Sequence, residues 1–185
     1  MREAEIKQAL TLYLGENSPE HSPLFLEELR MNGGEVRADL VRIGDMHCFE
    51  IKSEADSLAR LVSQGSRYSR AFDRVTLVTA KKHLEKALPM LPTWWGIIVI
   101  PENTGKPFKH IRKAQPNKGH EASVLASLLN RDEALNVLTE SGITKGVKSK
   151  SLYTIQAMIA ETLPLDQLKK SVQDSLISRA SCLMN

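Results

Sequence analysis

Hydrophobic and polar residues follow several different periods along the chain, and each change of period predicts a different element. Apolar residues at helical spacing predict a first helix over residues 2–14. Short apolar runs then alternate with turn-forming residues at 32–34 and 44–45, which is typical of antiparallel strands. The three strands predicted here span residues 24–30, 35–43 and 46–53.

The next stretch alternates helical and strand patterns. A buried stripe predicts a helix over residues 57–72, and β-branched or apolar runs predict strands over 74–80 and 94–100. A short helix is expected between those strands, around residues 81–88. Strand, helix, strand, helix, strand implies parallel crossovers beside the hairpins, so the pattern predicts an α/β fold with a mixed sheet flanked by helices.

After Gly119 the pattern is helical throughout, which predicts a core over residues 1–115 and a C-terminal helical subdomain over 119–185. The predicted helices there span residues 120–129, 131–141, 151–163 and 165–177. The helix, basic turn and helix of residues 132–163 are faintly similar to a SAP-like DNA-binding motif. A helical hairpin that caps the sheet or forms a homodimer interface is the alternative, and both stay open.

Composition limits the class of protein. The chain has 185 residues, 42% of them hydrophobic, which is enough for one substantial core. No stretch has the length and apolarity of a membrane span, and the first ten residues carry acids where a secretory signal is apolar, so a cytoplasmic protein is expected. Cys48 and Cys182 are far apart and match no ligand spacing, which indicates reduced thiols.

Positive charge is concentrated in the second part of the chain. Residues 101–185 hold 12 Lys and Arg against 8 Asp and Glu, and Lys106–Lys118 carries five basic residues and no acid. A polyanionic partner such as nucleic acid fits this pattern, and an ordinary solvated basic loop fits it equally well.

The segment between residues 35 and 52 holds the candidate chemistry. If residues 44–45 form a two-residue type II′ turn with glycine first, the register of the hairpin is fixed. The resulting pairs are Ile43 with Met46, Val41 with Cys48, Asp39 with Glu50, and Arg37 with Lys52. Alternation with period two places all eight side chains on one face. The opposite face would carry Val36, Ala38, Leu40, Phe49 and Ile51.

Two carboxylates directly opposite each other on a sheet repel, so a cation is expected near Asp39 and Glu50. Arg37 and Lys52, one pair further along the face, could neutralise them in a structural salt-bridge network. A hard divalent cation such as Mg²⁺ is the other solution. The spacing alone leaves both open.

These residues resemble the signature of the PD-(D/E)XK nuclease superfamily, an acid on one strand and (D/E)-x-K on the next, here Asp39 and Glu50-Ile51-Lys52. Gln64 and Tyr68 are similar to the Q-x-x-x-Y motif of its RecB-like and resolvase-like branches. The likeness covers roughly residues 1–100, and the proline expected before the first acid is replaced by Ala38. The resemblance implies a restriction-endonuclease-like fold and a divalent-metal-dependent nuclease acting on nucleic acid, with DNA as the expected substrate.

The same resemblance implies a role for each site residue. Asp39 and Glu50 would bind Mg²⁺ or Mn²⁺ by their side chains and Ile51 by its carbonyl, while Lys52 would act on the attacking water. Glu28 is the candidate for a further metal ligand, with Glu5 on the first helix as its competitor and an exposed strand position as the alternative.

The helix after the hairpin supplies candidate contacts to nucleic acid. Gln64 and Tyr68 are four residues apart, with Arg60 and Arg67 near the same side, so amide, phenol and guanidinium groups could hold a phosphodiester backbone. The solvent face of an ordinary amphipathic helix is the alternative. For the whole chain, the alternative to a nuclease is a non-catalytic module that binds nucleic acid or a protein partner, because fold alone does not decide function.

Overall fold

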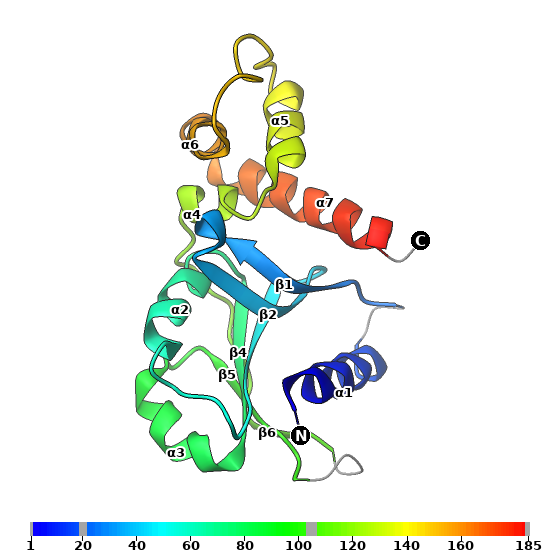
Figure 1. The fold of residues 1–185 in the computed structure, drawn as a ribbon, viewed down its shortest axis with the longest axis vertical. Coiled ribbons are helices and arrows are strands. Elements are labelled where there is room, and N and C mark those ends of the chain that lie inside the picture. The colour runs from blue at the N-terminus through cyan, green and yellow to red at the C-terminus, as the bar shows by residue number, and fades with distance from the viewer. Residues whose placement is uncertain (1, 19–21, 103–106, 184–185) are drawn as a thin grey trace.

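Six strands form one mixed sheet within the part of the chain that the computed structural model describes, residues 2–18, 22–102 and 107–183 (Figure 1). In order across the sheet they are β1 (Phe25–Met31), β2 (Val36–Arg42), β3 (His47–Lys52), β4 (Arg74–Thr79), β5 (Gly96–Val99) and β6 (Lys109–Arg112). Strands β1 to β3 pair antiparallel, β3 to β5 pair parallel, and β6 runs antiparallel to β5.

Helices cover both faces of this sheet and continue beyond its β1 edge (Figure 1). On the sheet lie α1 (Glu3–Glu16), α2 (Leu61–Tyr68) and the short α3 (Leu84–Ala87). Three 3-10 turns span Asn32–Gly34, Lys81–His83 and Leu88–Met90. The C-terminal helices are α4 (Ala122–Ala126), α5 (Arg131–Glu140), α6 (Leu152–Thr162) and α7 (Leu165–Leu183). The predicted α/β fold, a mixed sheet flanked by helices with a C-terminal helical subdomain, is confirmed.

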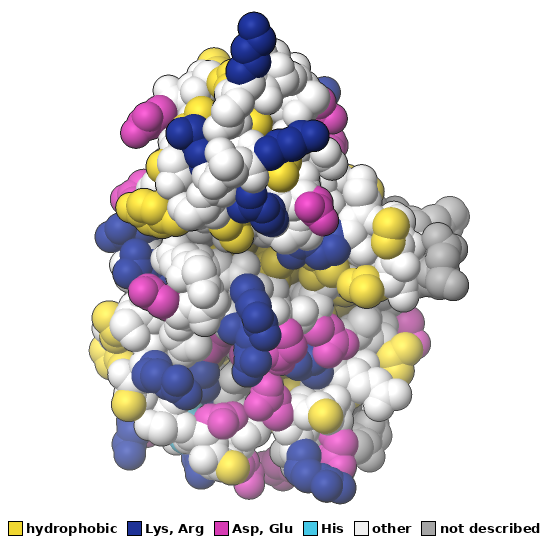
Figure 2. Space-filling model, turned by 45° about the horizontal axis from the view of Figure 1, so that its top comes forward, with side chains coloured by type: hydrophobic (Ala, Val, Ile, Leu, Met, Phe, Trp, Pro, Cys, Tyr) yellow, Lys and Arg dark blue, Asp and Glu magenta, His cyan; other side chains and the backbone are white. Residues whose placement is uncertain are grey.

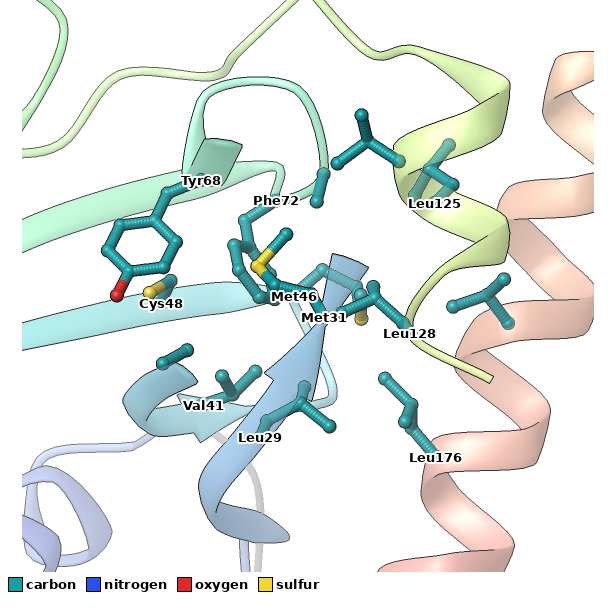
Figure 3. Packing of buried hydrophobic residues seen from close by; sticks show 14 of the residues in the cluster. Leu29, Met31, Val41, Met46, Cys48, Tyr68, Phe72, Leu125, Leu128 and Leu176 are labelled. Carbon is teal, nitrogen blue, oxygen red and sulfur yellow. The ribbon is translucent and has the colours of Figure 1, made fainter. Parts of the chain in front are cut away.

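Two buried clusters hold these layers together. The smaller lies under α1, where Leu10 packs with Leu40 and Phe49 of the sheet. The larger lies on the other face, under α2, and continues without interruption into the C-terminal helices. Figure 3 shows Met31 of β1 beside Leu128 and Leu176, which come from the segment after α4 and from α7. The C-terminal helices therefore share their core with the sheet.

Polar contacts tie the C-terminal helices to the turns at the end of the sheet. Lys169 of α7 donates to Asp73 at 2.6 Å, and His120 Nε2 lies 2.8 Å from the same carboxylate. Gln173, one turn further along α7, donates to the carbonyl oxygens of Ile43 and Gly44 at 3.0 and 2.8 Å. Within the described ranges, no helix is both long and apolar enough to cross a membrane.

Several predicted boundaries differ from the structure. The helix predicted over residues 57–72 is shorter, Leu61–Tyr68, and the last helix is longer than predicted, reaching Leu183. Residues 109–112, expected in a basic loop, form β6, because the free edge of β5 pairs with backbone groups whatever the side chains are. Lys106, the first basic residue of that stretch, lies outside the described residues.

The hairpin between β2 and β3 has the predicted register near the turn but a different turn, and the predicted pairs Asp39–Glu50 and Arg37–Lys52 do not form. Val41 pairs with Cys48, as predicted. Gly44 does not take the positive φ that a type II′ turn requires; Met46 does, with φ 43°, and its N–H donates to the Ile43 carbonyl at 3.1 Å. A four-residue loop that ends in a left-handed residue gives the same strand register as the predicted type II′ turn. The prediction of the turn type was therefore wrong, although Val41 and Cys48 pair as predicted.

The alternation of side chains along β2 breaks at Asp39. Leu40 packs in the cluster under α1, whereas Ala38 and Val36 join Val41 in the cluster on the opposite face. The prediction that Ala38 and Val36 share a face with Leu40 is therefore wrong. Glu28, next to Asp39 on β1, has a left-handed φ of 54°, so both strands are irregular at the same level of the sheet.

A close approach between β4, β5 and the segment after β6 makes Gly96 sensitive to substitution. In Gly96→Ala, the Cβ atom would overlap Thr76 Oγ1 and lie 2.9 Å from the Ala114 backbone nitrogen. Thr76 is buried and hydrogen-bonded to His47, so it cannot move away freely. We expect Gly96→Ala to lower the free energy of unfolding in urea by about 2 kcal/mol.

The matched control is Gly15→Ala on α1, where a Cβ atom meets nothing within 4 Å. Alanine favours a helix over glycine, so no loss of stability is expected there. An equal loss in both variants would contradict the close approach at Gly96.

Candidate functional site

A polar hollow opens where β2 separates from β3, and we call it the fork. The two strands pair only between Leu40–Arg42 and His47–Phe49, so the first half of β2 lies apart from the end of β3. The hollow has a volume of about 560 Å³. It is lined by Glu3, Arg30, Gly33, Gly34, Glu35, Arg37, Asp39, Ile51, Lys52, Asp56, Arg60 and Gln64. The fork thus gathers charged side chains from α1, the first three strands and the start of α2.

Glu50 lies beneath the fork with no exposed surface. Its carboxylate accepts a hydrogen bond from the Tyr68 hydroxyl at 2.7 Å and another from the Lys52 ammonium group. Burial, and then the charge of Glu50, raise the pKa of Tyr68 above its ordinary value, which keeps the phenol protonated as a donor. The Tyr68 oxygen also lies 2.9 Å from the Arg37 carbonyl, so α2, β2 and β3 meet at this one group.

Asp39 is held differently. Its Oδ2 accepts the Ile51 backbone N–H at 2.7 Å, so the side chain takes the place of a strand-to-strand bond. Burial and the charge of Glu50 raise its pKa to about 7, while the Ile51 N–H and the Lys52 charge act in the opposite direction. Within the described residues, no Lys or Arg nitrogen pairs with this carboxylate within 4.0 Å.

Three carboxylates meet at the fork. Oxygen atoms of Glu3, Glu28 and Asp39 lie within 4.8 Å of one another. Lys7 and Arg37 both form ion pairs with Glu28, and Lys7 also lies 4.0 Å from Glu3 and 3.7 Å from Glu27. Oxygen ligands this close together could hold one hard divalent cation.

The structure places the predicted metal ligands in two groups. Asp39 and Glu28 come together as predicted, whereas the Glu50 carboxylate is occupied by Tyr68 and Lys52. Ile51 presents its N–H to Asp39. Glu3 was missed, because only the packing of α1 brings it to the strands.

Glu5, the residue named as competitor for the further ligand, instead accepts the Arg2 backbone N–H at 2.8 Å at the start of α1. The hydrogen bond from the Arg2 backbone N–H lowers the pKa of Glu5 below its ordinary value. The first helix therefore contributes a carboxylate to the fork from Glu3, two residues before the one proposed.

The four residues of α2 and its start that were predicted to contact nucleic acid also lie in different places. Arg60 and Gln64 line the fork, and Arg67 lines a second cleft next to it. Tyr68 is fully buried and points to Glu50, so the predicted ridge that combined its phenol with exposed amide and guanidinium groups does not form. Residues 61, 65 and 68 pack inward, which leaves Arg60 exposed and Gln64 and Arg67 half-buried at the flank of the helix. The amide oxygen of Gln64 is itself buried.

Comparison with known proteins gives one consistent result. A family model described as Bacteriophage P4 protein cII matches residues 1–182. Protein cII of Enterobacteria phage P4 is 28% identical over 188 residues, an alignment that covers 100% of this chain and 70% of the relative. No solved structure matches the chain.

These matches overturn the resemblance to the PD-(D/E)XK superfamily, and with it the prediction of a metal-dependent nuclease. The predicted catalytic roles of Asp39, Glu50 and Lys52 rested on that resemblance. The physical reason for the error lies in Glu50 and Lys52. An acid and a lysine two residues apart on one strand also satisfy each other as a buried ion pair, and the two side chains form that pair here.

We expect Tyr68→Phe to destabilise the protein, because the buried Glu50 carboxylate would lose a hydrogen-bond donor. A buried charged acceptor left short of a partner costs about 2 kcal/mol in unfolding free energy. The control is Tyr13→Phe, which removes an exposed hydroxyl 3.0 Å from His110 and should change stability by less than about 0.5 kcal/mol. Equal effects of the two variants in urea denaturation would contradict the role of Tyr68.

Asp39 should make stability depend on pH. Its pKa is about 7 in the folded protein and near 3.8 when unfolded, so between these values the folded state keeps a proton that the unfolded state has released. Stability therefore falls as pH rises through this window and levels off above it, and Asp39→Asn should remove that part of the change. We expect the wild type to lose about 2 kcal/mol relative to Asp39→Asn between pH 5 and pH 8.

The control for this measurement is Glu54→Gln, which neutralises an exposed loop carboxylate. It should follow the wild type across the whole pH range. A pH dependence that is the same in wild type and Asp39→Asn would show that the folded state does not hold this proton.

Proposed function

The chain belongs to the family described as Bacteriophage P4 protein cII, and from that premise we propose that it binds the phosphodiester backbone of a nucleic acid, with DNA as the expected ligand, without cleaving it. The observation that carries this proposal is a row of polar side chains along one flank of α2, beside the fork and the cleft next to it. Arg60, Gln64 and Arg67 lie at i, i+4 and i+7, the spacing that aligns side chains along one face of a helix.

This face joins two hollows. Arg60 and Gln64 line the fork and Arg67 lines the cleft beside it, and Gly33 and Glu35 line both. Seven residues of helix span about 10 Å, which matches the rise of roughly three nucleotides along one strand. Two guanidinium groups and an amide at this spacing suit contacts to successive phosphates, which position a nucleic acid without reading its sequence.

The arginines at the rim of the fork are available for such contacts. Arg30 and Arg60 are exposed, and neither forms an ion pair within 4.0 Å to any acid among the described residues. Arg37 and Lys52, in contrast, are engaged by Glu28 and Glu50. Figure 2 shows Lys and Arg side chains next to Asp and Glu side chains on the face below the C-terminal helices. Unpaired guanidinium groups on this face favour an anionic ligand over a neutral one.

Lys7 and Arg37 offset part of the charge of the three carboxylates at the fork, and the remaining negative charge would repel a phosphate. We propose that Glu3, Glu28 and Asp39 hold Mg²⁺ or Mn²⁺ there, since their oxygens lie close enough for one ion. When bound, such an ion would neutralise the carboxylates and offer a ligand position to a phosphate oxygen. Binding of nucleic acid should then be stronger with the divalent cation than with EDTA.

The test is the affinity of the protein for labelled DNA by fluorescence anisotropy over a series of salt concentrations. We expect Arg60→Ala to weaken binding and to reduce the slope of log K against log salt by about 1, because one phosphate contact is lost. Lys86→Ala, which removes an exposed charge from α3, should leave both values unchanged.

Two results would contradict the proposal. One is the absence of salt-dependent binding to any nucleic acid at low ionic strength. The other is an equal effect of Arg60→Ala and Lys86→Ala. The cation is tested separately in the same assay: Asp39→Asn should remove the difference between Mg²⁺ and EDTA, and a difference that persists would place the ion elsewhere.

A further inference from the structure

A cleft of about 670 Å³ lies between the sheet domain and the C-terminal helices. One wall carries Arg67 and Arg70 from α2 and the turn after it, and the other is formed by the first turns of α6. The side of the C-terminal helices offers apolar groups from Val124, Leu152 and Ala157 between polar ones, and acids at Glu35 and Glu121 also line the cleft. The cleft thus combines an apolar strip with charges of both signs.

Tyr153 is the most exposed large side chain at this cleft, with 82% of its surface accessible. Among the described residues it has no ring contact with another aromatic group. Its neighbours in the lining, Leu152 and Ala157, come from the same end of α6, and Val124 comes from α4. An exposed aromatic ring beside small apolar groups offers a flat surface on which a planar ligand can stack.

Two arginines and two glutamates line the cleft, and among the residues that the structure describes there Arg67 is the basic group left free for a phosphate. Arg67 forms no ion pair within 4.0 Å to an acid in the described ranges, and Arg70 is paired with Glu121 at 3.3 Å. Lys148 and Lys150 are exposed on the segment that leads into α6, a few residues before Tyr153. A ligand that combines flat rings with phosphates would meet both kinds of contact in this cleft.

We infer that the cleft binds an unpaired nucleobase of a single-stranded nucleic acid, stacked on Tyr153, while the backbone continues along Arg67 towards the fork. This inference rests on the proposed function and names its ligand more closely. The cleft and the fork share Gly33 and Glu35, so one strand can pass from one to the other without leaving the surface. Bases of an intact duplex are stacked on each other and cannot enter, so the cleft selects single strands.

The experiment compares an oligonucleotide as a single strand with the same sequence as a duplex, using wild type, Tyr153→Ala, Tyr153→Phe and Leu12→Ala. Loss of one base–aromatic stack weakens binding by about tenfold, so Tyr153→Ala should lose that factor for the single strand and nothing for the duplex. Tyr153→Phe keeps a ring and should bind normally. Leu12→Ala, which removes another exposed apolar side chain from α1, should also bind normally.

A second readout follows the base directly. A strand containing 2-aminopurine loses fluorescence when that base stacks, so the wild type should quench it and Tyr153→Ala should not. Sedimentation of the wild type over a range of concentrations shows whether the cleft is instead filled by a second copy of the chain.

The outcomes separate this inference from the proposed function. Equal affinity for single strand and duplex, unchanged in Tyr153→Ala while Arg60→Ala still weakens binding, overturns the inference and leaves the proposed function standing. A dimer that Tyr153→Ala dissociates also overturns it, because the cleft would then be a protein interface. Absence of binding to any nucleic acid overturns both.

Discussion

A carboxylate with no exposed surface needs hydrogen-bond donors inside the protein, and Glu50 has two among the described residues, Lys52 on its own strand and Tyr68 on α2. Burial of an unpaired charge would cost several kcal/mol, so Lys52 and Tyr68 are held in place by the need to satisfy it. Tyr68 also reaches the Arg37 carbonyl on β2. The same contact fixes how α2 is rotated: Tyr68 is turned inward, Gln64 lies half-buried one turn before it, and Arg67 lies at the flank of the helix. The hydrogen bond inside the protein therefore also sets which side chains of α2 border the fork and the cleft beside it.

Asp39, on the neighbouring strand β2, is a second carboxylate, half-buried, and it is stabilised by a different contact. Asp39 sits close to Glu50, and two ionised carboxylates at this level of the sheet would repel. The Asp39 carboxylate accepts a hydrogen bond from the Ile51 N–H, and the alternation of side chains along β2 shifts by one residue at this point. Before Leu40, β2 no longer pairs with β3. The fork is therefore a consequence of placing two acids on adjacent strands, and the acids themselves create the space in which Glu3 and Glu28 join Asp39.

Hydrophobic patterning predicted β1 to β5 and the pairing of Val41 with Cys48, because these strands are defined by which side chains they bury. It could not predict that the alternation of side chains shifts by one residue at Asp39, because a period of two assumes a regular strand without interruption. Glu3 was missed, and Tyr68 was wrongly assigned to nucleic-acid contacts, for a different reason. The positions of both side chains depend on how α1 and α2 pack on the sheet, and the spacing of residues along the chain carries no information about that packing. The motif around Glu50 misled because an ion pair and a nuclease site need the same residue types.

The two outer strands of the sheet are left in very different surroundings. β6 is exposed and carries Lys109 and Arg112, and charged side chains on an outer strand discourage pairing with another chain. β1 carries Glu27, Glu28 and Arg30, but its Leu26, Leu29 and Met31 are buried in the cluster that continues into the C-terminal helices, and α7 contacts this strand. Separated from those helices, β1 would expose these apolar side chains beside its charged ones. Beyond any part in binding, the C-terminal helices thus cover an apolar side of an outer strand that would otherwise be open to other chains.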